Sequence, residues 1–424
     1  MTLKNYFASM LIQKPKGTYD LLPEKAFKRT FLENEIRRIF SKFNYEEIRT
    51  PTFEKTSLFK RGIGEETDIV SKEMYTFNDD EFTLKPEMTA SVVRSYLENS
   101  LYNESPLQKL FYISNMFRRE RPQAGRFREF SQFGAEAIGS PDYLIDAEMI
   151  LLADSVLKEF KIDNVVIKIN TIGTLPERDV YLSVLKNYLS KYLPELSKDT
   201  QRRYHKNPLR ILDTKDANDI EILKDAPVLF EFLNDVTKKY FENVLTALSS
   251  LNLRFEVDHK LVRGFDYYTS TTFEFVSDAL GSQNSLLGGG RYDLLIEQLG
   301  GKPTPAIGFA AGIERLMMIL EADNYVFPEK SRIKLYVATI GEDSRSYSLN
   351  LITELRNAGI KCETDFLNRS IKSQMREANK QNAEYVIVLG EEEMKTNLCK
   401  LKKMSDGSEE TIKLEKLGNA FNNR

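Results

Sequence analysis

With 424 residues, 41% of them hydrophobic and 29% charged, the chain has the composition of a soluble globular protein of roughly two to three domains. No apolar run approaches the ~18 residues that a membrane span needs. The first residues lack the basic start and long apolar core of a signal peptide, so we expect no membrane association. The net charge of −3 leaves a nucleic-acid partner open, because local basic patches would have to meet it. We expect residues 1–9 to lie outside the fold.

Cysteine and histidine are scarce. Cys362 and Cys399 form neither a disulfide framework nor a metal quartet, which fits a reducing cytoplasm. His205 and His259 are too few for a histidine-based metal site, so we expect structural roles for both. The sequence identifies no side-chain metal ligands.

A helix is predicted from about Pro23 to Phe43, because apolar residues recur there every three or four positions. Residues 46–54 follow with the pattern of a strand. Pro51 within it cannot donate to a ladder, which favours an edge or an interface position. A long helix followed by an edge strand indicates either a dimerisation surface or an ordinary solvent-covered edge, and the pattern leaves both open.

Residues 58–77 have the composition of a charged loop, and Glu81–Leu84 reads as a short strand. An apolar helix is predicted over Ala90–Tyr96, with Thr89 as its candidate N-cap. Glu87 lies where strand meets helix. Its carboxylate either faces a pocket or is a first-turn acid favoured by the helix dipole.

A basic hairpin is predicted around residues 117–136. Aromatic and apolar runs flank a middle that contains proline and glycine, which indicates two antiparallel strands joined by a loop. Its arginines are Arg118, Arg119, Arg121, Arg126 and Arg128. Arginines held in a rigid frame suit a polyphosphate, because the guanidinium fork matches phosphate oxygens. A solvated basic hairpin is the alternative.

The middle of the chain predicts a helix over residues 142–160, a strand over 165–170, and a strand over 251–257. Between these strands, residues 175–248 are helix-rich and highly charged, which indicates an inserted helical module. Three motif-bearing pieces follow, at residues 261–268, 288–293 and 306–316. The last has strand-to-helix character, with glycines that allow close approach of a ligand to the backbone.

A shift in composition near residues 324–332 marks a domain boundary. Beyond it strands and helices alternate, with predicted elements at 335–339, 344–358, 362–365, 371–382 and 384–390. This βαβαβ order predicts a small α/β domain with a largely parallel sheet.

The candidate functional groups share a character. They are arginines (Arg118, Arg126, Arg263, Arg315), acids (Glu87, Glu120, Glu136) and tyrosines (Tyr267, Tyr268, Tyr292). No phosphate-binding GxxxxGK[ST] loop and no GxGxxG after a strand is present. Several arginines with few acid–base candidates favour nucleotidyl transfer, which needs charge stabilisation on phosphorus more than proton transfer.

The chain resembles the histidyl-tRNA synthetases, a family of class II aminoacyl-tRNA synthetases, from about Pro15 to Leu417. The matching blocks, in the family's order, are KGTYDLLP, LFKRGIGEETDIVSKEMYTF, FRRERPQAGRFREFSQFGAE, LVRGFDYYT, LGGGRYD and AIGFAAGIERL. RGFDYY and GGGRYD together are specific to histidyl enzymes rather than to class II in general.

The resemblance implies an α+β fold. Residues 1–325 would form a catalytic domain on an antiparallel sheet with flanking helices and a helical insertion at about 175–248. Residues 326–332 would be a linker, and 333–424 an α/β anticodon-binding domain that reads unpaired bases. It also implies a cytoplasmic homodimer, formed through the first helix and the Pro51 strand. The expected reaction joins L-histidine to tRNA(His) with ATP as substrate and Mg²⁺ accompanying it.

Site roles follow residue by residue from the resemblance. Arg118 and Arg263 are the expected catalytic residues. The expected ATP contacts are Arg118, Glu120, Arg126, Phe130 and Arg315. The expected histidine contacts are Glu87, Met88, Thr89, Gln132, Glu136, Tyr267, Tyr268 and Tyr292. Gln123 and Arg128 match positions that meet the acceptor end of the tRNA.

One block departs from the family pattern. Many bacterial members have an arginine and a glycine where Lys85 and Met88 stand in KPEMT. Two rivals share the fold: a regulatory paralogue without the anticodon domain, and an RNA-binding or stress-sensing module. The retained arginines disfavour both.

Overall fold

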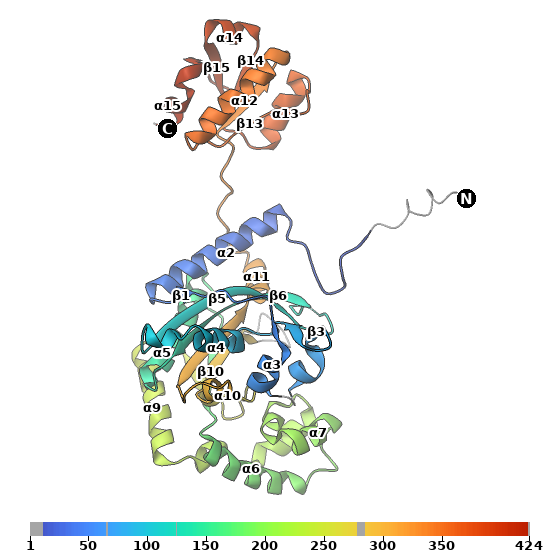
Figure 1. Cartoon of the computed structure of the whole chain (residues 1–424), viewed down its shortest axis with the longest axis vertical. Coiled ribbons are helices and arrows are strands. Elements are labelled where there is room, and N and C mark those ends of the chain that lie inside the picture. The colour runs from blue at the N-terminus through green and yellow to red at the C-terminus, as the bar shows by residue number, and fades with distance from the viewer. Residues whose placement is uncertain (1–11, 65–66, 124, 278–284, 423–424) are drawn as a thin grey trace, which may run out of the picture. The chain divides into compact units, whose positions relative to one another are not determined.

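The computed structural model of the chain describes residues 12–64, 67–123, 125–277 and 285–422. The chain divides into two compact units, one up to Val326 and one from Phe327 onward (Figure 1). The expectation for residues 1–9 falls outside the described residues. Among the helices of the described segments, none is both long and apolar enough to cross a membrane.

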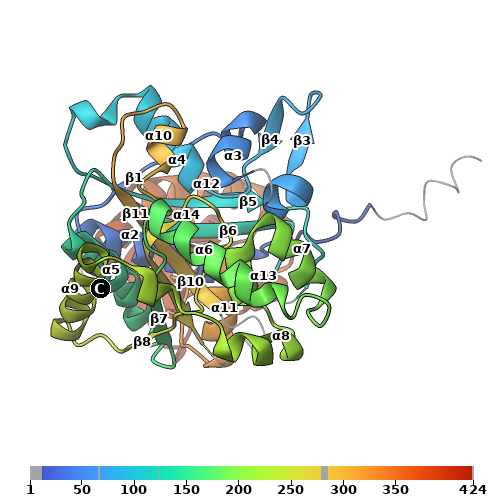
Figure 2. The same cartoon turned by 90° about the horizontal axis from the view of Figure 1, so that it is seen from below.

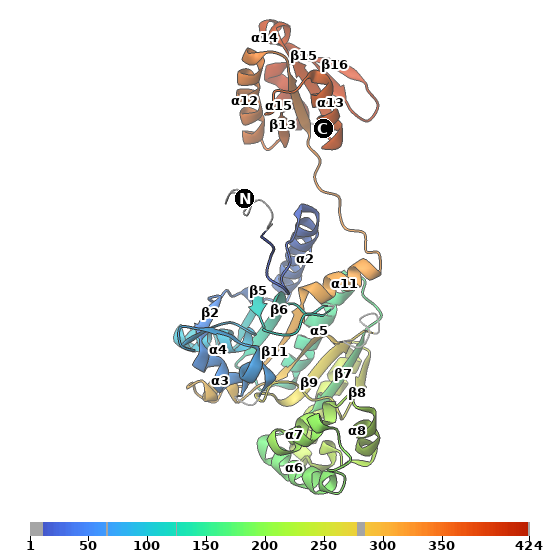
Figure 3. The ribbon, with the colours of Figure 1, turned by 90° about the vertical axis from the view of Figure 1, so that its right-hand side faces the viewer.

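A large, mostly antiparallel sheet forms the centre of the first unit (Figure 3). In the described part of the chain its strand order is β1-β5-β6-β11-β10-β9-β7-β8. The bounds are β1 Glu46–Glu47, β5 Gln108–Phe117, β6 Glu129–Ile138, β7 Val166–Thr171, β8 Phe255–Val257, β9 Thr269–Val276, β10 Ser285–Arg291 and β11 Ala306–Gly312. Among the described strands of this sheet, only the two edge pairs, β1 with β5 and β7 with β8, are parallel.

The predicted basic hairpin is confirmed as β5 and β6. Their register runs from Gln108 opposite Ile138 to Phe117 opposite Glu129. The other side of β6 pairs with β11, in register from Gln132 opposite Gly312 to Ile138 opposite Ala306. The hairpin therefore lies inside the sheet, and its arginine-bearing loop leaves from one end.

Side-chain alternation divides this sheet into two faces, because successive strand residues point to opposite sides. Phe133 of β6 faces helix α2 (Pro23–Lys42), whose Phe40 ring lies 6.3 Å from it and 4.9 Å from Phe111. Helices α5 (Tyr143–Glu159) and α11 (Ile313–Ala322) pack on the same sheet. Phe40 is fully buried, so replacing it with alanine would cost about 3–5 kcal/mol.

Two expectations in the N-terminal third are wrong. The predicted strand over 46–54 is two strands, and only β1 belongs to the large sheet. The second, β2 (Phe53–Lys55), joins β4 (Phe82–Leu84) and β3 (Tyr75–Phe77) in a three-stranded sheet. The interruption falls around Pro51, which cannot donate to a ladder.

The second error concerns residues 58–77, which are not simply a loop. Helix α3 (Thr56–Ile63) buries Leu58, Phe59 and Ile63, and a short π-helix spans Ile69–Glu73. The apolar residues of α3 are interleaved with lysine and arginine, and eight residues are too few to show a clear helical period.

The helix-rich prediction for residues 175–248 is confirmed. The helices are α6 Leu175–Ser190, α7 Lys198–Lys206, α8 Ala217–Ile222 and α9 Asp235–Ser250. Figures 1 and 2 show α6 and α7 on the side of the sheet away from α2. Helix α9 differs from the others, because it packs along α5, where Tyr143 and Tyr240 stack edge to face with their ring centroids 6.5 Å apart.

The second unit confirms the predicted βαβαβ order. Its parallel strands are β12 (Leu335–Thr339), β13 (Cys362–Thr364) and β14 (Tyr385–Leu389), in the order β13-β12-β14. The helices are α12 Glu342–Asn357, α13 Ile371–Lys380, α14 Glu391–Thr396 and α15 Leu417–Asn422. An antiparallel hairpin that was not predicted, β15 (Leu398–Lys403) with β16 (Glu409–Lys413), extends the sheet. Both cysteines are buried free thiols in this unit.

Candidate active site

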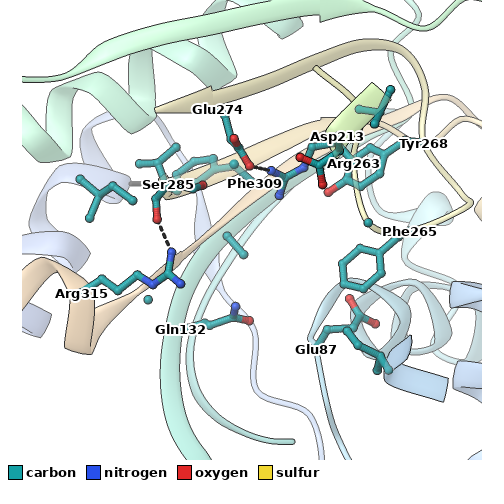
Figure 4. Close-up of a pocket in the computed structure, with 18 of the residues that line it drawn as sticks. Glu87, Gln132, Asp213, Arg263, Phe265, Tyr268, Glu274, Ser285, Phe309 and Arg315 are labelled. Carbon is teal, nitrogen blue, oxygen red and sulfur yellow. Dashed lines mark hydrogen bonds and ion pairs between the residues drawn. The ribbon is translucent and has the colours of Figure 1, made fainter. Parts of the chain in front are cut away.

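A cavity of about 670 Å³ opens on the face of the large sheet that carries Gln132 (Figure 4). Its walls come from the β4–α4 junction, the hairpin, the helical segment, residues 258–268 and strands β9 to β11. The predicted site residues that line it are Glu87, Met88, Thr89, Arg118, Glu120, Arg126, Phe130, Gln132, Arg263, Tyr267, Tyr268, Tyr292 and Arg315. The fold thus brings together residues from distant parts of the sequence.

We name the two ends of this cavity by their chemistry. The arginine end comprises Arg118, Glu120, Arg126, Phe130 and Arg315. The carboxyl–tyrosine end comprises Glu87, Thr89, Glu136, Tyr268 and Tyr292. In Figure 4, Gln132 lies between Arg315 and Glu87, and Arg263 lies beside Tyr268.

Glu136 belongs to the carboxyl–tyrosine end but lies behind the residues that line the cavity, and it is 1% exposed. Its Oε2 accepts a hydrogen bond from Tyr292 Oη at 2.6 Å, and its Oε1 accepts one from Thr89 Oγ1 at 2.9 Å. Burial raises the pKa of Glu136 from its ordinary 4.5 to about 8. A Cβ on Gly308 would lie 1.7 Å from Glu136 Oε2, so the glycine of β11 is what makes room for this carboxyl group.

The prediction that Thr89 caps a helix is wrong. Helix α4 (Thr89–Glu98) has Met88 at its N-cap position, and the preceding residue does the capping. The Glu87 carboxylate accepts from the backbone N–H groups of Thr89 at 2.8 Å and Ala90 at 2.9 Å. Thr89 keeps its hydroxyl for Glu136. Burial raises the pKa of Glu87 despite these bonds.

Aromatic rings form the wall of the carboxyl–tyrosine end. The Tyr267 ring lies 4.7 Å from that of Tyr268 and 5.8 Å from that of Tyr292. Phe265 packs against Tyr267 at 5.2 Å. Burial raises the pKa of all three tyrosines, so their phenols stay protonated and able to donate.

Arg263 sits at this wall and carries its own counter-ion. Its guanidinium pairs with Glu274 of β9 and lies 5.8 Å from the Tyr268 ring centroid. A Cβ on Gly288 would lie 2.4 Å from Arg263 Nη1, which explains the first glycine of GGGRYD. The arginine of that motif has a different role, because Arg291 is buried in an ion pair with Asp146 of α5 at 2.8 Å.

The guanidinium groups of the arginine end are bonded to backbone carbonyls or to the Glu120 carboxylate. Arg118 donates from Nε to the Pro86 carbonyl at 2.9 Å and lies 5.2 Å from the Phe130 ring centroid. Glu120 accepts from Arg126 at 3.2 Å. Arg315 donates to the Ser285 carbonyl, and burial, together with nearby Arg126, lowers its pKa.

Besides Glu136, two predicted residues lie apart from the cavity walls. The Arg128 guanidinium donates to the carbonyls of Glu120 and Lys16, each at 3.3 Å. Gln123 forms a backbone bridge with Arg126. Arg119, for which no role was predicted, donates to the Lys72 carbonyl.

Some lining residues were not predicted. Glu274, Asp213 and Phe265 all face the cavity. The sequence signal for Glu274 is a single acid between phenylalanines in the strand TTFEFV, where burial would require a partner. Asp213 lies in the charged helical segment and carries no comparable signal. Neither His205 nor His259 lines the cavity.

Comparison with known proteins now identifies the family. The family model of histidyl-tRNA synthetase matches residues 17–316, and the anticodon binding domain model matches residues 334–424. This chain belongs to the histidyl-tRNA synthetase family. The histidine–tRNA ligase of Halothermothrix orenii is 46% identical over 411 residues, which covers 96% of this chain and 98% of that protein.

Other relatives agree. The histidine–tRNA ligase of Listeria monocytogenes is 44% identical over 420 residues, covering 97% of this chain and 99% of that protein. The crystal structure of apo S. aureus histidyl-tRNA synthetase superposes with a TM-score of 0.82 at 37% identity, covering 97% of this chain and 100% of the other. The predicted fold class, a mixed α+β synthetase with a C-terminal anticodon-binding domain, is thereby confirmed.

Proposed function

We propose that this histidyl-tRNA synthetase uses the cavity to convert L-histidine and ATP to histidyl-adenylate, and then transfers histidine to the 3′ end of tRNA(His). The chain is an aminoacyl-tRNA-forming ligase with ATP as a substrate, because histidine–tRNA ligases match nearly its whole length. The observation that carries the site assignment is the meeting of four arginines (Arg118, Arg126, Arg263, Arg315) at one cavity, with the buried Glu136 bonded to two residues that line it, Tyr292 and Thr89.

The arginine end suits ATP. An oxygen of the histidine carboxylate attacks the α-phosphorus, the bond to the bridging oxygen breaks, and pyrophosphate leaves. Arg118 and Arg263 would offset the charge that grows on phosphorus, since fixed guanidinium groups stabilise such a transition state. Phe130 offers a ring face for adenine beside Glu120. Arg126 and Arg315 would hold the outer phosphates.

The carboxyl–tyrosine end suits histidine. Glu136 with Tyr268 and Tyr292 can contact both nitrogens of an imidazole, whereas an apolar side chain of similar shape would leave them unpaired. Glu87, Thr89 and Gln132 line the cavity and would contact the α-ammonium group, with Met88 and Tyr267 completing the wall. An ammonium placed here would favour the ionised form of both glutamates.

Mg²⁺ would accompany ATP. Within the described segments, no cluster of three or more His, Cys, Asp or Glu side chains could hold a metal ion by itself. That fits Mg²⁺, which commonly takes one or two carboxylates and otherwise substrate phosphates and water. Glu274 and Asp213, which face the cavity near Arg263, are the proposed carboxylates. The ion would offset charge on the phosphate chain.

The remaining assignments concern RNA and assembly. Gln123 and Arg128 lie on the hairpin loop, where they would meet the acceptor end of the tRNA. The second unit would read the anticodon. We propose a cytoplasmic homodimer formed through α2 and the edge strand β1 with the adjoining Pro51, which is supported by the exposure of that segment.

The test is ATP–pyrophosphate exchange with histidine and a panel of other amino acids. Exchange with histidine alone supports the proposal. Binding of tRNA without any exchange would instead support an RNA-binding or sensing protein. A regulatory paralogue is disfavoured by the anticodon-domain match and by the complete arginine set.

Arg263→Ala is expected to reduce exchange by at least about 10²–10³-fold, because a preorganised charge beside the reacting phosphate is lost. The matched control is Arg94→Ala, which also breaks a half-buried arginine–glutamate pair (with Glu54) but lies outside the cavity. Both variants are checked for folding by circular dichroism and for assembly by sedimentation. Near-normal exchange in Arg263→Ala would contradict the role given to this residue.

A further inference from the structure

The N-terminal motif KGTYDLLP does not line the cavity, yet it contacts two elements that do. The Tyr19 ring packs on Phe127 of the hairpin loop with ring centroids 4.8 Å apart. The Tyr19 phenol donates to Glu314 Oε1 at 2.5 Å. Phe127 and Glu314 both line the cavity, and each is adjacent in sequence to an arginine of the arginine end, Arg126 and Arg315.

Glu314 fixes the start of helix α11 to the sheet. The β6–β11 ladder ends with Gln132 opposite Gly312. The next backbone N–H on β6, that of Ser131, is accepted by the Glu314 carboxylate, with both oxygens at 3.0 Å. Strand β11 ends at Gly312, so the Glu314 side chain accepts the hydrogen bond that a further residue of β11 would otherwise accept. Arg315 follows directly and points into the cavity.

Tyr19 is the group that orients this carboxylate. Its hydrogen bond is shorter than the 3.4 Å contacts that Arg29 of α2 makes with Glu314 Oε1 and with Tyr19 Oη. Burial, followed by the charge of Glu314, raises the pKa of Tyr19, so the phenol stays a donor. A charge-assisted bond of this length holds both partners tightly.

The rest of the segment holds the hairpin loop by its backbone. The Gly17 carbonyl accepts from the Arg128 backbone N–H at 2.8 Å, and the Lys16 carbonyl accepts from the Arg128 guanidinium. Gly17 has φ +90°, and a Cβ there would lie 2.9 Å from side-chain atoms of Arg128 and Pro122. Only glycine allows this close crossing.

We propose that residues 16–20 act as a strap that holds the arginine end in its ATP-binding arrangement, with Tyr19 as a positioning residue for Arg126 and Arg315. The strap joins the hairpin loop and the start of α11. Among the described residues, the β6–β11 pairing ends with Gln132 opposite Gly312. The inference rests on the proposed function, because it assigns a role toward ATP. Histidine binding at the other end does not involve the strap.

Tyr19→Phe tests this, because it keeps the ring on Phe127 and removes only the bond to Glu314. KM for ATP in pyrophosphate exchange is expected to rise about tenfold, the effect of losing one charge-assisted hydrogen bond. KM for histidine is expected to stay within about twofold, since no strap contact reaches the carboxyl–tyrosine end. Gly17→Ala is expected to raise KM for ATP further, because it displaces the strap.

The matched control is Tyr45→Phe. Tyr45 is also a buried tyrosine whose phenol donates to a glutamate, Glu148 at 3.5 Å, but it lies outside the cavity. This variant is expected to change Tm without changing either KM.

An unchanged KM for ATP in Tyr19→Phe, or equal changes in both KM values, would overturn the strap while leaving the proposed function intact. Absence of histidine-dependent exchange in the unaltered chain would overturn the proposed function itself.

Discussion

The residues of the carboxyl–tyrosine end are buried and bond to one another, whereas the arginine end includes side chains that are exposed to solvent. Glu136 is 1% exposed and is bonded to Tyr292 and Thr89, both on other elements. The Arg126 side chain, by contrast, is 39% exposed and pairs with Glu120. The carboxyl–tyrosine end is therefore hydrogen-bonded internally before any substrate binds, whereas the arginines of the other end have partners that substrate phosphates can replace.

This difference suits the two ligands that we propose for the cavity. An imidazole is small and has one donor and one acceptor, so preformed and desolvated partners give selectivity. A triphosphate carries many charged oxygens, and guanidinium groups bonded to backbone carbonyls, as Arg118 is to Pro86, can transfer to them. In our proposal, the strap holds the arginine end in place through contacts made from outside the cavity.

Arg118→Ala addresses the arginine end most directly. Exchange is expected to fall about 10²–10³-fold, because a charge near the α-phosphate and a contact to Phe130 are lost together. Its neighbour provides the control, since Arg119 donates to the Lys72 carbonyl outside the cavity. Equal losses in Arg118→Ala and Arg119→Ala would mean that the loss reflects the general charge of the hairpin.

Gly308→Ala tests the carboxyl–tyrosine end. The added Cβ would lie 1.7 Å from Glu136 Oε2, so the carboxyl group must move and histidine turnover is expected to fall about 10²-fold. Gly312→Ala on the same strand is the control, because its Cβ meets nothing closer than 3.8 Å. KM for histidine should separate the two variants. A response of KM for ATP instead would contradict the division into two ends.

Glu136→Gln tests how much the buried Glu136 carboxyl group of the carboxyl–tyrosine end lowers the free energy of unfolding at high pH. The native pKa of Glu136 is about 8 and its ordinary value is 4.5, so between these pH values the folded state binds more protons than the unfolded state. The free energy of unfolding therefore falls as pH rises through this range. Glutamine does not titrate, so the variant's Tm should gain on the unaltered chain between pH 5 and pH 8.5, by roughly 2–4 °C per kcal/mol.

Melting curves at the two pH values, without histidine, provide the measurement. The curves at pH 5 serve as the internal control, because Glu136 is then protonated in the folded state. A Tm difference that does not change with pH would mean that this carboxyl group is not desolvated.

Hydrophobic periodicity and turn-forming residues predicted most elements, including the hairpin and the C-terminal α/β order. Long amphipathic segments largely determine their own secondary structure. The cap of α4 was mispredicted for a physical reason. The sequence rule for caps considers the side chain at the N-cap position itself. In α4 the cap is Glu87, one position before the N-cap, which accepts from two backbone N–H groups.

The site was harder to predict than the fold. Arg118 and Arg119 are adjacent and chemically identical in sequence, and only the geometry at the end of β5 directs one toward Phe130 and the other toward Lys72. Glu274 was missed because its meaning depends on Arg263, a partner eleven residues away on another segment. The motifs of the family supplied what pattern reasoning could not.

The ion pair of Arg291 with Asp146 has a consequence for how this chain can be shortened. Tyr240 of α9 accepts from Arg291 Nε at 2.8 Å, so that helix helps to satisfy a charge buried in the catalytic unit. At the other boundary, the Glu177 carboxylate in the first turn of α6 accepts from the Asn234 backbone N–H at 2.8 Å. The two places where the helical segment can be cut therefore lie side by side near residues 177 and 234. A deletion that also removed α9 would leave Arg291 without one of its partners. A deletion limited to the residues between 177 and 234 would keep Tyr240, so the buried charge would remain hydrogen-bonded.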